Sequence, residues 1–136
     1  MFNRILLSVD GSENLDRAVR ATMDLARIHD AEVLVVHGRK PAPVVAPILT
    51  SDVADDEAAL RVAAAVSELR SCAVRARGKL LPRGALGPEI VKAARSTRAD
   101  LIVVGSRGLA AREELDDGAR SSTGIPSADR PMLLVC

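Results

Sequence analysis

Short apolar runs alternate with longer amphipathic stretches along the chain. Four runs are rich in branched aliphatic residues, and they cover residues 5–9, 33–36, 101–104 and 132–135. Short, largely apolar runs of this length are typical of strands buried on both faces of a parallel sheet. Because stretches with helical periodicity separate them, the pattern favours a layered α/β fold over a bundle or a sandwich. A further, weaker strand is predicted over residues 73–81.

Helices are predicted between these strands. The first begins just after Ser12, a good N-cap, and one of its faces carries Leu15, Ala18, Val19, Thr22, Leu25 and Ala26. The next helix begins near Ser51 or Asp52 and has acidic residues in its first turns, namely Asp55, Asp56 and Glu57. It continues to about Leu69 through Leu60, Ala63, Ala64 and Val66. A later helix takes Gly87 as N-cap and Pro88 as its first residue.

One segment interrupts this regular alternation. Residues 40–51 contain Pro41, Pro43 and Pro47. Proline lacks a backbone donor and clashes with the preceding helical turn, so the segment is predicted to be a loop rather than a regular helix.

Composition and charge narrow the class of protein. A chain of 136 residues can bury a continuous core without disulfides or metals, so we expect one domain over residues 1–136. Of its residues, 48% are apolar and Phe2 is the only aromatic one, so the core is aliphatic. The formal charge is +1, with no basic stripe or aromatic platform, which disfavours nucleic acid as a partner.

The cysteines and the lengths of the apolar runs bear on location. Cys72 and Cys136 have neither the spacing of a metal site nor that of a disulfide framework, which fits a reducing compartment. No apolar run approaches the roughly 20 residues that span a bilayer. We therefore expect a cytoplasmic protein without a membrane partner.

Two glycine turns mark the expected ligand-binding end. In a doubly wound sheet, ligands bind outside the carboxyl ends of the strands, where the strand order reverses. If the first and fourth strands are neighbours, the turns Asp10-Gly11-Ser12 and Gly105-Ser106-Arg107-Gly108 face one crevice. A carboxylate there suits the hydroxyl or amino groups of a nucleoside, and glycine-rich backbone suits phosphate. The glycines could equally serve only to reach positive φ, and Asp10 could serve only as a turn or cap residue.

In these and other segments the sequence resembles the universal stress protein family. The resemblance is carried by residues 5–12, 25–26, 31–37, 99–108 and 131–135, together with Gly84, Ile90 and Ala94. It implies a five-stranded parallel sheet of order 3-2-1-4-5 with helices on both faces. It also implies that ATP or a related adenine nucleotide is bound in a stress-response or regulatory role, with Mg²⁺ or Mn²⁺ as a possible companion.

The nucleotide-binding members of that family carry the pattern Gly, two residues, Gly, nine residues, Gly, and then Ser or Thr. This chain has Gly105, Gly108 and Gly118 at that spacing, but Ala119 replaces the hydroxyl residue. Ser121 or Ser122 could partly substitute. Gly124 and Pro126 interrupt the helix that the family runs into its last strand, so this helix is expected to be short, kinked or displaced.

The resemblance assigns a set of binding residues. They are Asp10, Gly11, Ser12, Val36, His37, Gly105, Arg107, Gly108, Gly118, Ala119, Arg120 and Ser121. Arg107 and Arg120 could instead be solvated surface residues, and His37 could be structural. No Ser-His-Asp, paired-carboxylate or Cys-His pattern points to catalysis, so at most slow ATP hydrolysis is expected.

The resemblance also implies a homodimer. The last strand of the chain, residues 132–136, is expected to be an apolar sheet edge. Such an edge would favour aggregation unless it were paired. The alternative function is a dimeric interaction module of the same fold that binds no nucleotide, because Ala119, Gly124 and Pro126 depart from the binding pattern.

Overall fold

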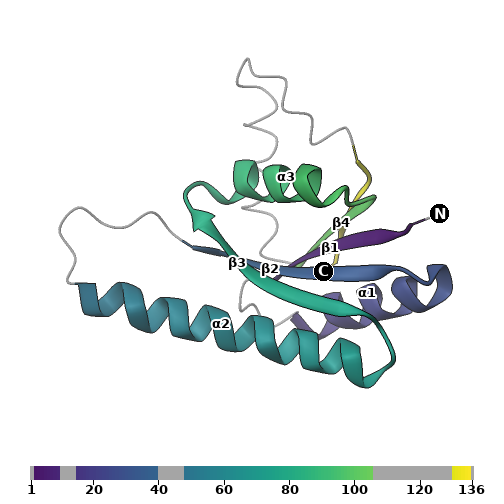
Figure 1. Cartoon of the computed structure of the whole chain (residues 1–136), viewed down its shortest axis with the longest axis horizontal. Coiled ribbons are helices and arrows are strands. Elements are labelled where there is room, and N and C mark those ends of the chain that lie inside the picture. Colours follow the sequence, from purple (N-terminus) through teal and green to yellow (C-terminus); the bar gives the residue numbers. More distant parts are fainter. Residues whose placement is uncertain (1, 10–14, 40–47, 106–129, 136) are drawn as a thin grey trace, which may run out of the picture.

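In the computed structural model, residues 2–9, 15–39, 48–105 and 130–135 are described. Within them, five parallel strands form one sheet in the order β3-β2-β1-β4-β5 (Figure 1). The strands are β1 (Arg4–Val9), β2 (Glu32–Arg39), β3 (Ala76–Arg83), β4 (Leu101–Val104) and β5 (Met132–Leu134). The helices are α1 (Leu15–His29), α2 (Ile48–Ser71) and α3 (Leu86–Thr97). The predicted fold class and strand order are confirmed.

The helices cover the sheet on both faces, with α1 and α2 on one side and α3 on the other (Figure 1). The chain moves outward from β1 to β3 and then crosses back to β4. Because parallel crossovers are right-handed, this reversal places the returning helix on the opposite face.

Side chains of the central strands alternate between two apolar cores. In β1, Ile5, Leu7 and Val9 pack with α1 and α2, whereas Leu6 packs in the core beneath α3. Both cores are built mainly from aliphatic side chains. The largely apolar runs therefore correspond to strands with two buried faces, as the sequence predicts.

The predicted apolar face of α1 is largely confirmed. Ala18, Val19, Thr22 and Ala26 are all buried. Thr22 is the polar member of this face, and its hydroxyl donates a hydrogen bond of 2.8 Å to the Ala18 carbonyl. Its burial therefore leaves no unsatisfied donor.

The predicted start of α2 is wrong. The helix begins at Ile48 rather than near residue 51 or 52, so the last residues of the predicted loop are helical. The last proline of the segment is Pro47, and none occurs within residues 48–71, so nothing in this stretch opposes a helix. The acidic residues 55–57 consequently lie beyond the first turn, where the dipole argument no longer applies.

The predicted course of α2 through Leu60, Ala63, Ala64 and Val66 to Leu69 is confirmed as helix, but only part of this series packs on the sheet. Leu60 is 69% exposed, and Ala63 and Ala64 are exposed as well. The buried face of the described part of α2 consists of Ala58, Val62, Ala65, Val66 and Leu69. An alanine-rich helix has several candidate apolar faces, and the sheet beneath it selects one.

The start of α3 is likewise earlier than predicted. Its N-cap is Ala85, which makes no side-chain cap hydrogen bond, and Leu86 is its first residue. Pro88 therefore lies third in the helix. Proline is tolerated there because the first N–H groups of a helix have no intrahelical partner.

All three helices end in a residue with left-handed backbone, and none of these residues is glycine. They are Asp30 (φ 52°), Ala73 (φ 63°) and Arg98 (φ 55°). In each case the next residue donates its N–H to the carbonyl five positions earlier, at 2.9 to 3.1 Å. Ala73 thus belongs to a helix-terminating turn, and β3 begins at Ala76 rather than at the predicted residue 73.

Among the described residues, no helix is both long enough and apolar enough to cross a bilayer.

Candidate functional site

The carboxyl ends of β1 and β4 lie side by side at the centre of the sheet. Ser8 of β1 is level with Val36 of β2 and with Val104 of β4, and Val9 is level with His37. The strand order reverses between β1 and β4. This is the switch point at which open parallel sheets bind ligands outside the strand ends.

Three of the predicted binding residues belong to the described part of the chain. Val36 and His37 lie on β2 beside the end of β1, and buried Gly105 directly follows β4. The structure brings these three residues to the same end of the sheet, on β2 and after β4, which flank β1. The other predicted residues lie outside the described ranges, and they are Asp10, Gly11, Ser12, Arg107, Gly108, Gly118, Ala119, Arg120 and Ser121.

His37 connects the end of β2 to α2. Its Nδ1 lies 2.6 Å from the Gly38 carbonyl oxygen, and its Nε2 lies 3.5 Å from Nη1 of Arg61. A carbonyl only accepts hydrogen bonds, so Nδ1 is the donor and Nε2 is left as an acceptor for the arginine. The imidazole is therefore oriented by both neighbours, although the long Arg61 contact is the weaker of the two.

A charged cluster beside this end was missed by the sequence reasoning. The Asp55 carboxylate on α2 forms ion pairs with Arg39 Nη1 at 3.8 Å and with Arg83. Arg39 also donates from Nε to the Leu81 carbonyl at 2.7 Å. The cluster joins α2 to the ends of β2 and β3. Its members are far apart in the sequence, so no local pattern predicts their contact.

Gly38 is needed for close packing near the same end. A Cβ atom at this position would overlap Cδ1 of Leu86, the first residue of α3. Glycine inside a strand commonly marks such a close approach. This signal was present in the sequence, since Gly38 follows the run of residues 33–36 directly after His37.

The described residues of this end suit binding by backbone and apolar surface. Val36 and Val104 are almost completely buried, and Gly105 contributes backbone without a side chain. Glycine lets backbone N–H groups come close to a phosphate. Within the described ranges, no group of three or more His, Cys, Asp or Glu residues is placed to hold a metal ion.

Comparisons with known proteins agree with this geometry. The model of the universal stress protein family matches residues 1–135. A universal stress protein of Thermus aquaticus is 35% identical over 140 residues, which cover 99% of each chain.

Solved structures show the same fold. A universal stress protein from Archaeoglobus fulgidus superposes with a TM-score of 0.77 at 24% identity and covers 100% of both chains. A structure of the universal stress protein from Archaeoglobus fulgidus in complex with dAMP has a TM-score of 0.74 at 22% identity, and 98% of each chain is covered.

Proposed function

The chain belongs to the universal stress protein family, and we propose that it binds ATP or a related adenine nucleotide in a stress-response or regulatory role. The observation that carries the proposal is the parallel pairing of β1 with β4, from Ile5 with Leu101 to Ser8 with Val104. It puts Val9 and Val104 at the ends of adjacent strands at the switch point. In the proposal, Asp10 and the glycine turn after β4 meet the ligand from these two strands.

Structures of the same fold support the nucleotide class. Universal stress proteins of this fold are known in complex with dAMP, with cAMP and with AMP. The adenine moiety is common to all three ligands. A site that recognises adenine and ribose through Asp10 and β2 would serve any of them.

Each part of the nucleotide is assigned to a different segment. The Asp10 carboxylate accepts from the ribose or adenine, helped by Gly11 and Ser12, and the backbone from Val36 to Gly38 frames the base. The phosphates are held by backbone and side chains of Gly105, Arg107, Gly108, Gly118, Ala119, Arg120 and Ser121. Mg²⁺ or Mn²⁺ accompanies the phosphates in this proposal, because a divalent ion neutralises their charge.

A binding titration tests the proposal. Purified protein is titrated with a fluorescent ATP analogue, with and without Mg²⁺, and unlabelled ATP is then used in competition. Saturable binding is expected from the parent, and Asp10→Ala and Gly118→Val are each expected to weaken it about tenfold or more. Asp24→Ala is the matched control, because Asp24 is an exposed carboxylate on α1. An absence of saturable binding by the parent would contradict the proposal and favour the interaction module without nucleotide.

We also propose a homodimer formed through β5. This strand pairs with β4 on one side and is the last strand of the sheet. The Val135 N–H bonds to the Val104 carbonyl at 2.9 Å, so the alternate residue, Leu134, directs its N–H to the open edge. Leu134→Pro removes that donor. Light scattering should show a dimer for the parent and a monomer for the variant, whereas a monomeric parent would contradict the proposal.

A further inference from the structure

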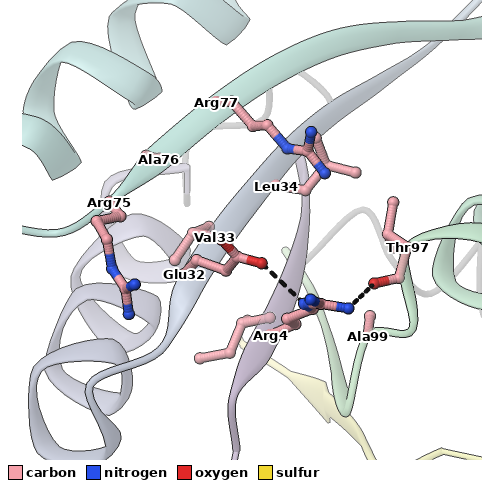
Figure 2. Close-up of a pocket in the computed structure, with 10 residues that line it drawn as sticks. Arg4, Glu32, Val33, Leu34, Arg75, Ala76, Arg77, Thr97 and Ala99 are labelled. Carbon is pink, nitrogen blue, oxygen red and sulfur yellow. Dashed lines mark hydrogen bonds and ion pairs between the residues drawn. The ribbon is translucent and has the colours of Figure 1, made fainter.

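A hollow lies at the amino ends of the strands, at the opposite end of the sheet from the candidate nucleotide site (Figure 2). Its volume is about 150 Å³, and it is formed by the amino ends of β1, β2 and β3 and by the residues around the end of α3. The polar lining residues are Arg4, Glu32, Arg75, Arg77 and Thr97. All of them belong to the described part of the chain, and all are remote from the carboxyl ends of β1 and β4.

Alternation along the strands places these charges on one face. Ala76 is buried in the core beneath α1 and α2, so Arg75 and Arg77 on either side of it project from the opposite face. Arg77 is level with Leu34, which belongs to the core beneath α3. Arg4 and Glu32 are also level with each other. The four charged side chains therefore surround the hollow from three adjacent strands.

Two of the three arginines have partners in the protein. Arg4 lies between Glu32 and α3 (Figure 2), with Nε 2.8 Å from the Glu32 carboxylate and Nη1 3.3 Å from the Thr97 carbonyl. Arg75 donates from Nη2 to the Asp30 carbonyl at 2.9 Å. These contacts give both residues a structural role, since they satisfy carbonyl groups at or next to helix ends.

Arg77 differs from both of them. Within the described ranges it has no hydrogen-bond or ion-pair partner, although it lines the same hollow. A charged residue on an edge strand can serve only to prevent strand pairing. Lys79 already supplies such a charge two residues further along the same face. Prevention of strand pairing therefore does not explain why Arg77 lies in a hollow beside two other guanidinium groups.

We infer that this hollow binds a small oxyanion, a phosphate or a short dicarboxylate, through the Arg77 guanidinium. The fork of N–H donors on arginine matches a carboxylate or phosphoryl group in two parallel hydrogen bonds. Three arginines and one glutamate give the lining a net formal charge of +2. A hollow of about 150 Å³ is smaller than the 300–1,000 Å³ typical of drug-sized ligands, so the ligand is smaller than a nucleotide.

The test uses the full-length protein and ¹H–¹⁵N NMR in a buffer free of phosphate, at constant ionic strength. Inorganic phosphate and succinate are titrated separately to about 10 mM, a range that detects millimolar binding. Saturable shifts are expected at residues 32–34 and 75–77. The ion that causes them identifies the ligand as phosphoryl or dicarboxylate. Shifts from neither ion, or shifts confined to His37 and Gly105, would overturn the inference.

Three variants test whether the charges in the hollow change the affinity for the ion in the expected direction. Arg77→Ala should weaken binding about tenfold, and Arg77→Lys should weaken it less, because the charge remains while the fork is lost. Glu32→Gln should strengthen binding severalfold, because a repelling charge is removed. Lys79→Ala is the matched control on the same strand and face, and it should leave the affinity unchanged. Equal losses for Arg77→Ala and Lys79→Ala would show mere surface attraction and overturn the site.

Discussion

The two ends of the sheet differ in how the chain joins helices to strands. At the amino ends of the strands, α1, α2 and α3 are followed by short connections over residues 30–31, 72–75 and 98–100. Each connection begins with a helix-terminating turn. Arg75 accepts a backbone hydrogen bond from Val33 of β2, Asp100 donates one to Arg4 of β1, and the Asp30 carbonyl accepts from the Arg75 side chain. At the carboxyl ends, the connections that follow β1, β2 and β4 are longer.

From this difference we expect substitutions at the amino ends of the strands to change mainly the stability of the fold. Substitutions at the carboxyl ends should change mainly the proposed ligand binding. Connections at the amino ends are fixed by backbone and side-chain hydrogen bonds, so changes there should lower the free energy of unfolding. Loops at the carboxyl ends can vary and carry binding groups, because the strands beneath them hold their positions. The amino-end hollow is the exception in our proposal, because Arg77 lines it without a hydrogen-bond or ion-pair partner among the described residues. Four substitutions test the division.

The strongest test is Asp100→Ala at the amino end. The Asp100 carboxylate accepts hydrogen bonds from the backbone N–H groups of Asn3 at 2.6 Å and Arg4 at 3.0 Å. Losing two bonds to a charged acceptor should lower the free energy of unfolding by about 3 kcal/mol. Urea denaturation measures this change, with Asp24→Ala as the control. Nucleotide affinity of the folded variant should stay unchanged, and a parallel loss of affinity would break the proposed division.

Gly38→Ala tests whether the carboxyl end is also tightly packed. The new methyl group overlaps Cδ1 at the end of the partly buried Leu86 side chain, which must turn aside, so the unfolding free energy should fall by about 1 kcal/mol. Shortening the neighbour in the double variant Gly38→Ala, Leu86→Ala should make the combined loss smaller than the sum of the two single losses. Additive losses would show that the two residues do not compete for space.

Asp55→Asn removes the charge that joins α2 to β2 and β3. The side chains of Asp55, Arg39 and Arg83 are 23%, 29% and 32% exposed, so water screens their attraction only in part. We expect a loss of about 1 kcal/mol that shrinks as salt is added. Asp56→Asn, at the exposed neighbouring position, is the control. Equal effects of the two substitutions would mean that the cluster contributes no specific stability.

Ala73→Gly should produce the smallest change, and it should stabilise the protein. Left-handed backbone strains alanine but not glycine, and the greater flexibility of glycine in the unfolded chain offsets part of the benefit. A gain of about 0.5 kcal/mol is expected from thermal or urea unfolding. Ala63→Gly within α2 should instead lose about 1 kcal/mol. A loss at both positions would show that the strain at Ala73 is negligible.

The fold was predictable where local signals were strong. Strands β1 and β4 have two buried faces and thus appear as largely apolar runs, and the Thr22 face of α1 follows helical periodicity. Helix starts were less predictable. A helix can begin directly after Pro47, and Pro88 can occupy the third position of a helix, so proline marks a region rather than a boundary.

For the candidate site, the sequence predicted the location but not the side-chain contacts around it. The sequence indicated the end of the sheet and the strands involved, because turn residues follow the strands directly. It did not indicate the contact of His37 with Arg61 or that of Asp55 with two arginines. These contacts depend on how α2 lies across β2 and β3, and no spacing within one segment encodes that arrangement.

The pairing of β1 with β4 has a consequence for synthesis of the chain. The bond from Asn3 to Asp100 spans 97 residues, and closing so long a loop costs entropy that its contacts must repay. On the ribosome, β1 can pair with β2 early, but its other edge waits until residues 101–104 have emerged. A chain stalled before that point leaves the backbone N–H and C=O groups of Leu6 and Ser8 unpaired on the free edge of β1 and lacks the switch point. We therefore expect such a chain to be prone to aggregation, because an unpaired strand edge is a template for pairing with other chains.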